Sequence, residues 1–417
     1  MPFYWGTIIV DFSTRNLNIK YRHKLKILKL NGFERIKMSK FDLVLKGGHL
    51  VDPSESINSP KDIAFSDGKV AEISPQISPS RAIKVVNVDD CFVTPGLIDL
   101  HTHVYWGGTS LGIDAEDFCR KSAVTTSVDT GSAGPGNFAG FRKHVIEKSA
   151  VNILAYLHVS HAGIFAFSDR VMVGESENIS LMDPITAIEI VEENRDYIVG
   201  IKVRLGKHTS GKNGISPLAV AKEVAQKTNL PIMVHIDEAP PSYSEVLDQM
   251  RASDILTHCF RPLPNSPVGA NKKILPAVQR ARERGVLFDV GHGMGSFSFE
   301  VTKIMLDEKF YPDTISSDIH AMCINGPAHD LVTTLSKFLT LGMSFYEVIN
   351  SCTNNASKAL KRPELGNLRV GSRGDASILN IKKGKFEYFD VKGKKLIGNQ
   401  KICVEGVVLG GKWWFPD

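Results

Sequence analysis

The sequence predicts an α/β fold: a (β/α)8 TIM-type barrel with a small β-sandwich domain built from both chain ends. Three observations lead to this prediction. Eight short apolar strands alternate with amphipathic helical stretches through the middle of the chain, polar residues end many of these strands, and short strands flank the region on both sides. A doubly wound open sheet is the alternative. Polar ends on many separate strands favour the barrel.

The composition is that of a globular protein with a large core. Of the 417 residues, 42% are hydrophobic and 23% are charged, and a chain of this length needs no disulfides to fold. The six cysteines form no CxxC pair, which favours free thiols in a reducing compartment, and we expect a cytoplasmic protein. No apolar run reaches about 18 residues, so no membrane-spanning helix is expected.

The net charge of +5 comes from the first residues of the chain. Residues 1–38 hold eight Lys/Arg and two Asp/Glu, a local charge of +6, which leaves −1 for residues 39–417. A neutral body argues against a nucleic-acid partner. Residues 1–38 show no clear period and end at a second methionine, Met38, so we expect a non-native or disordered extension. A basic membrane-touching arm and a targeting peptide are the alternatives.

Residues 39–93 and 363–417 are predicted to form the β-sandwich. Short strand patterns occur in DLVLKGG, DIAFSDGKVAEI and AIKVVNVDDCFVTPG, and Asp67-Gly68 marks a hairpin between two of them. Near the other end of the chain, three further strands are expected in DASILNIKK, KFEYFDVKGKKL and KICVEGVVLGGKWWF.

Residues 94–362 are predicted to form the barrel. Helical stretches such as SPLAVAKEVAQKT and KILPAVQRARERG separate its strands. The eight strand candidates are GLIDLHTH, AVTTSVDT, NILAYLHVS, IVGIKVRL, PIMVHID, DILTHC, GVLFDVGH and TISSDIH.

Four histidines stand at the carboxyl ends of three predicted strands. His101 and His103 follow GLIDL, and strand alternation places them on one face. His235 ends PIMVH and His258 ends DILTH. Any one of them alone would be read as an ordinary buried histidine. Together they predict a set of imidazole ligands, which suits zinc and related metals.

Asp318 and Lys202 extend this set. Asp318 ends TISSD, where a barrel enzyme places a ligand or a base, although a helix N-cap is the structural alternative. Lys202 shares its strand face with Gly200 and Arg204 and should point into the barrel. A buried ammonium is costly, so Lys202 either pairs with an acid or is modified. Addition of carbon dioxide to its amine would give N6-carboxylysine, whose two oxygens can bridge two metals.

These residues, in this order, resemble the amidohydrolase superfamily of binuclear metal hydrolases. GLIDLHTH, AVTTSVDTGSAG, GIKVRL, PIMVHIDE, ILTHCF, FDVGHGMGSF and SSDIH resemble its deacetylase/dihydroorotase-like branch, and GSRGDASILN near the end of the chain strengthens the match. The resemblance covers about residues 40–413.

The resemblance implies two divalent metal ions, with zinc expected and manganese, iron and nickel left open. It implies that His101, His103 and Asp318 hold the more buried ion. His235 and His258 would hold the other, and carboxylated Lys202 would bridge the two. A bridging water with its pKa lowered from about 15.7 towards about 7 would be the nucleophile. Asp318 would act as base and then as acid.

The sequence also departs from the family's patterns. Dihydroorotases carry an Arg two residues after HxH, where this chain has Tyr105, and the metal-bridging cysteine of D-aminoacylases has no match near Asp129. The substrate is expected to be a small molecule, contacted by His292, His320 and Glu238, in a homo-oligomer that binds no nucleic acid and no membrane.

Three functions compete. The first is hydrolysis of an amide or ester bond in a small acyl compound, of deacetylase or cyclic-amide type. The second is a mononuclear nucleobase-type deaminase, in which Glu238, three residues after His235, would move protons. Such an enzyme does not need Lys202. The third is an inactive relative, which would have lost ligands that are all present here.

Overall fold

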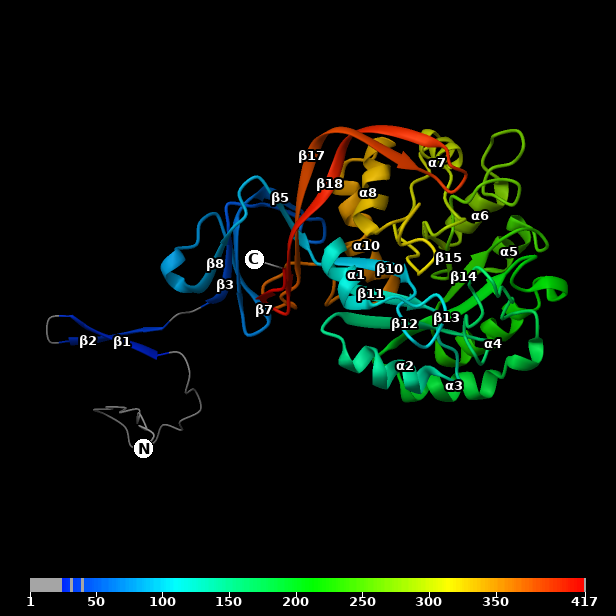
Figure 1. The fold of residues 1–417 in the computed structure, drawn as a ribbon, viewed down its shortest axis with the longest axis horizontal. Coiled ribbons are helices and arrows are strands. Elements are labelled where there is room, and N and C mark those ends of the chain that lie inside the picture. The colour runs from blue at the N-terminus through cyan, green and yellow to red at the C-terminus, as the bar shows by residue number, and fades with distance from the viewer. Residues whose placement is uncertain (1–24, 31–32, 39–40, 416–417) are drawn as a thin grey trace.

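The computed structural model describes residues 25–30, 33–38 and 41–415. Its central feature is a curled parallel sheet whose seven strands lie in chain order, with helices on the outside (Figure 1). The strands are β10 (Leu97–Thr102), β11 (Val124–Thr130), β12 (Asn152–His158), β13 (Ile198–Leu205), β14 (Ile232–Ile236), β15 (Ile255–Leu256) and β16 (Leu287–Phe288). The barrel prediction is confirmed.

The eighth predicted strand closes the barrel without becoming a regular strand. Residues 314–320 form single parallel bridges, Asp289 with Thr314 on one side and Thr102 with Ile319 on the other. The Asp318 amide donates to the His101 carbonyl at 2.7 Å. Asp318 itself has a φ of +49°, a left-handed conformation that interrupts an extended strand. The prediction of a regular strand here was wrong for that reason.

The helices pack around the outside of the sheet, most of them with one buried face (Figure 1). They are α1 (Ala115–Ser122), α2 (Phe138–His144), α3 (Pro184–Glu193), α4 (Pro217–Thr228), α5 (Tyr243–Gln249), α6 (Pro276–Glu283), α7 (Phe299–Asp307), α8 (Leu331–Thr340), α9 (Phe345–Ser351) and α10 (Asn354–Leu360). In α4, Pro217 stands in the first turn, and buried Leu218, Ala221 and Val224 recur at helical spacing. Asn229, in the left-handed conformation, ends that helix.

Two further sheets form the β-sandwich. One has the order β19-β18-β17-β9-β4-β5 and combines strands from before and after the barrel, and the other has the order β7-β6-β3-β8 and lies wholly before it in the chain. Their strands are β3 (Phe41–Lys46), β4 (His49–Asp52), β5 (Ile57–Pro60), β6 (Asp62–Ser66), β7 (Lys69–Ser74), β8 (Ala82–Asn87), β9 (Phe92–Pro95), β17 (Ala376–Phe389), β18 (Lys395–Leu409) and β19 (Lys412–Trp413). Leu43, Val93 and Ile378 share one core between the sheets.

Turns in these sheets agree with the sequence in one place and differ in another. Asp67 and Gly68 have φ of +51° and +75° and connect β6 to β7, which confirms the predicted hairpin. The expected strand KFEYFDVKGKKL instead contains a turn at residues 390–394. Its two halves end β17 and begin β18, which form one long hairpin (Figure 1). Asp390 accepts the amides of Lys392 and Lys394 and stabilises the turn.

Of the segment 1–38, the structure describes β1 (Leu25–Leu30) and β2 (Phe33–Met38), which pair antiparallel from Leu25–Met38 to Leu30–Phe33. The prediction for the rest of that segment lies outside the described residues. None of the helices that the structure describes is long and apolar enough to span a bilayer.

Candidate metal centre

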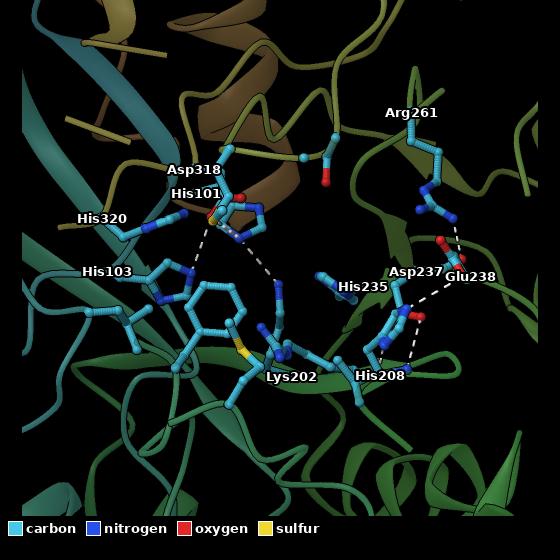
Figure 2. A pocket seen from close by; sticks show the side chains of 18 residues that line it. His101, His103, Lys202, His208, His235, Asp237, Glu238, Arg261, Asp318 and His320 are labelled. Carbon is cyan, nitrogen blue, oxygen red and sulfur yellow. Dashed lines mark hydrogen bonds and ion pairs between the residues drawn. The ribbon is translucent and has the colours of Figure 1, made fainter. Parts of the chain in front are cut away.

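The carboxyl ends of the barrel strands surround a cavity of about 270 Å³. His101 lies on β10 and His103 directly follows it, Lys202 comes from β13 and His235 from β14, and Asp318 lies on the closing segment. All five line the cavity, while His258 follows β15 and contacts His235 just behind it. Figure 2 shows His101, His103 and Asp318 gathered on one side, with Arg261 and Glu238 on the other.

Two histidines converge on a single carboxylate oxygen. The Nε2 atoms of His101 and His103 each lie 3.2 Å from Asp318 Oδ1. These three donor atoms lie within 4.8 Å of one another, and all three residues are buried. Two neutral imidazoles and one carboxylate are a ligand set that zinc prefers.

The hydrogen bonds around His101 fix which nitrogen is free. Thr257 donates its hydroxyl to Asp289 Oδ2 at 2.8 Å, so the Thr257 oxygen accepts from His101 Nδ1, also at 2.8 Å. The proton of His101 therefore sits on Nδ1, and the Nε2 lone pair faces Asp318. A chain from carboxylate to hydroxyl to imidazole is the kind of outer support that orients a metal-ligating histidine.

His235 and His258 form a second pair. His258 Nδ1 donates to the Gly291 carbonyl at 2.7 Å, which leaves the Nε2 lone pair facing His235 Nδ1 at 2.7 Å. The rings are nearly perpendicular, with an interplanar angle of 87°. His235 Nε2 is buried without a hydrogen-bond partner among the described residues. Two converging imidazoles, one of them under-satisfied, fit a further metal ion.

Lys202 lies between the two pairs, fully buried. Its Nζ is 3.4 Å from His101 Nε2 and 3.5 Å from the Met233 sulfur (Figure 2). Among the described residues, no carboxylate lies within 4.0 Å of this amine. Lys202 therefore forms no salt bridge with them, which was the alternative to a modified lysine. Burial lowers the pKa of Lys202 to about 7.

Burial also keeps the other groups in the form that binds metals. It lowers the pKa of His103 to about 3 and the pKa values of His101, His235 and His258 well below their usual range, so these imidazoles are neutral at pH 7. It raises the pKa of Asp318 to about 6, and the carboxyl remains mostly ionised at pH 7. The donor set therefore fits divalent metal ions.

The three expected substrate contacts lie in different places. His320 lines the cavity beside Phe167, with the ring centroids 5.7 Å apart. Glu238 also lines it, but its side chain is half exposed and lies 3.4 Å from His208 Nε2. His292 is fully buried and bonds to Lys337, and it is not among the cavity-lining residues.

The cavity wall also contains two arginines that the sequence did not predict as substrate contacts. Arg204 donates to Glu175 at 2.8 Å, and His158 lies 3.1 Å from the same oxygen. Arg261 is 8% exposed, its Nε lacks a partner among the described residues, and none of the described carboxylates lies within 4.0 Å of it. Its position three residues after His258 is the sequence feature that could have indicated a place near the proposed metal ligands.

Comparison with known proteins gives consistent results. The model of the amidohydrolase family matches residues 92–414. A deacetylase of Brucella anthropi is 34% identical over 84% of this chain and 82% of its own length. A deacetylase of Agrobacterium fabrum is 33% identical over 78% and 80%.

Solved structures agree in fold. The structure of an adenine deaminase has a TM-score of 0.84 at 29% identity and covers 90% of this chain and 100% of its own. That of a dihydroorotase has a TM-score of 0.80 at 31% identity, with 89% and 98% covered.

Proposed function

The chain belongs to the amidohydrolase family, in its deacetylase/dihydroorotase-like branch, and from that premise we propose a binuclear metal-dependent hydrolase of small acyl compounds. It is a hydrolase that acts on carbon–nitrogen bonds. The bond we propose is the amide, or the related ester, that joins an acyl group to a small molecule. The observation that carries this proposal is the convergence of two histidine pairs and Asp318 around buried Lys202.

We assign the ligands by their convergence. His101, His103 and Asp318 would hold one ion, and His235 and His258 the other, with zinc as the proposed metal. When bound, such ions lower the pKa of a water molecule and polarise the scissile carbonyl.

Lys202 is proposed to carry a carbamate. With a pKa of about 7, about half of this amine is neutral at pH 7 and has a free lone pair. The nitrogen forms a bond to the carbon of carbon dioxide and loses one proton to solvent, which gives a carbamate anion. This reaction replaces a buried cation by two oxygen donors, and it supports a site for two ions beside His101.

Asp318 is proposed to move the proton. Its Oδ1 lies between the two histidine nitrogens, and the residue lines the cavity where substrate must enter. The carboxylate would accept a proton from the attacking water and deliver it to the leaving nitrogen or oxygen.

Arg261 favours a substrate with a carboxylate. A buried guanidinium without an acidic partner among the described residues is stabilised when an anion binds beside it. We expect Arg261→Met to raise KM about tenfold or more for an N-acetyl amino acid but not for its uncharged amide. Arg280, which is exposed and paired with Asp248, is the matched control for substitution by methionine. Equal loss on both substrates would contradict this role.

The direct test is a screen of metal-loaded protein against N-acetyl, O-acetyl and cyclic-amide compounds. The readout is the formation of a new carboxyl group, as free acetate or as the ring-opened product. We expect hydrolysis of an acyl compound that is lost after dialysis against a chelator. The absence of turnover on all three classes would contradict the proposal.

A mononuclear deaminase is the second candidate, because a structure similar to this chain is that of an adenine deaminase. Its proton shuttle would be Glu238, but this side chain is half exposed and faces His208. Ammonia release from a nucleobase with one metal per chain would favour the deaminase.

A further inference from the structure

A second buried lysine lies outside the cavity. Lys337 of α8 is fully buried, and its ammonium has three acceptors from three separate segments. Nζ lies 2.7 Å from His292 Nε2, 2.8 Å from the Pro327 carbonyl and 2.8 Å from the Phe389 carbonyl of β17. Burial lowers the pKa of Lys337 to about 7, so the amine is protonated about half of the time at pH 7, and in that form its three protons match the three acceptors.

The His292 ring is fixed at both nitrogens. Its Nδ1 donates to the Gly293 carbonyl at 2.9 Å, so Nε2 keeps its lone pair and accepts from Lys337. The ring also stacks on Phe297, with centroids 4.6 Å apart and an interplanar angle of 26°. These contacts hold His292 in one orientation, and Lys337 supplies the hydrogen bond at Nε2.

His292 is the middle residue of a turn that touches two proposed metal ligands. Gly291 and Gly293 have φ of +47° and +53°. The Gly291 carbonyl accepts the Nδ1 proton of His258 at 2.7 Å. On the other side, a Cβ at Gly293 would lie 2.2 Å from Asp318 Oδ2, so the backbone of the turn packs directly against that carboxylate.

We propose that Lys337 is a positioning residue for the metal centre: it holds the Gly291-His292-Gly293 turn through His292, and the turn orients His258. This inference rests on the proposed function for the identity of the ligands. Lys337 touches neither cavity nor substrate. Its effect passes through one imidazole and one backbone carbonyl, a chain of the kind that orients metal-ligating histidines.

The test compares Lys337→Met with Ser336→Ala. Methionine keeps an unbranched side chain that is one heavy atom shorter, and it removes the amine donors. Ser336 is the adjacent buried residue of α8 and bonds the Ile402 amide of β18 at 3.0 Å, so its loss loosens the same helix without touching the turn. One readout is zinc affinity by chelator competition. The other is exchange of the His258 Nδ1 proton, followed by nitrogen-15 NMR on metal-free protein.

We expect Lys337→Met to weaken the less tightly held zinc ion about 10–100-fold and to speed exchange of the His258 proton, while Ser336→Ala leaves both unchanged. Equal effects of the two variants would overturn the proposal, because they would reflect general loosening of α8. Wild-type exchange in Lys337→Met would overturn it as well.

His292 supplies a second pair of variants in case Lys337→Met does not fold. His292→Gln keeps an acceptor for the ammonium and should retain most of the zinc affinity, whereas His292→Leu should behave like Lys337→Met. Similar behaviour of both His292 variants would contradict the proposal. If the wild-type protein binds no zinc, the proposed function fails, and the exchange measurement still decides whether Lys337 orients His258.

Discussion

The proposed metal centre depends on a few buried side chains whose protonation follows from their hydrogen bonds. At His101 the proton is placed on Nδ1 by Thr257 and Asp289, and at His258 it is placed on Nδ1 by the Gly291 carbonyl. Each histidine therefore presents the Nε2 lone pair inward. An imidazole turned the other way would present N–H to a cation, so these bonds decide whether the centre can form.

Replacement of Asp318 by asparagine separates metal binding from proton transfer. Asparagine is nearly isosteric and keeps an oxygen near His101 and His103, but it cannot accept the proton. We expect turnover to fall at least about 100-fold while elemental analysis finds most of the metal retained. Turnover near the wild-type rate would remove Asp318 from the base role.

Lys202→Ala should lose metal and activity together, because the proposed carbamate supplies oxygens to both ions. Formate or propionate added to this variant should restore part of the activity by filling the gap. Lys202→Arg should not be rescued, since its guanidinium keeps a positive charge in the same space. Intact mass under bicarbonate checks the modification directly, and unmodified Lys202 in a fully active protein would contradict it.

At the scale of elements, the regular barrel strands were the part of the fold that could be predicted from the sequence. His101, His103 and His235 could be placed together because parallel strands end at one face of a barrel and side chains alternate along them. The closing segment was predicted as a strand, yet Asp318 has a positive φ, which tertiary contacts impose and no local pattern shows.

Loop residues could not be placed from the sequence, because their direction depends on contacts with distant segments. His292 comes after a strand, as His258 does, but its ring bonds Lys337, 45 residues later, and is not among the cavity-lining side chains. Arg261 lies in the cavity wall with its guanidinium bonded to the Asp237 carbonyl, 24 residues earlier in the chain, as well as to the Asn265 carbonyl at 2.9 Å.

In the β-sandwich, Asp62 of β6 should carry measurable stability. Its buried carboxylate accepts from Lys46 at 2.6 Å, Ile77 at 2.8 Å and Gly47 at 3.0 Å. Burial alone would raise its pKa, but the hydrogen bonds, that from Lys46 first, hold the pKa below 3.8. We expect Asp62→Asn to lower the free energy of unfolding at pH 7 by about 1–3 kcal/mol.

This stability should also depend on pH. Because the folded-state pKa lies below the unfolded value of about 3.9, the contribution is complete above that value and is lost as pH falls through the folded pKa. Urea unfolding at pH 7 and near pH 3.5 should therefore show a shrinking difference between Asp62→Asn and wild type. Asp307→Asn, in an exposed pair with Lys303, is the control and should change little at either pH.

At the scale of the whole molecule, strands from before and after the barrel pair with each other next to its first strand. β9 pairs with β17 from Phe92–Leu379 to Pro95–Ala376, and β10 begins two residues after β9. The strand that bears His101 and leads into His103 thus follows directly after a strand of the sandwich. Its start is held by Ser377, which accepts the Leu97 amide at 3.1 Å.

Metal removal should therefore lower the stability of the whole fold. The proposed ligands come from β10, β13, β14, the residues after β15 and the closing segment, so an ion joins segments that unfolding would separate. A ligand present at about 100 times its Kd stabilises the native state by about 2.7 kcal/mol. We expect chelation to lower Tm by several degrees in calorimetry, and re-addition of zinc to restore it. Lys202→Ala, which should hold little metal, is the control and should melt near the chelated wild type with or without chelator. If the wild type loses bound metal without any change in Tm, the ions do not join these strands, and the assignment of the centre is wrong.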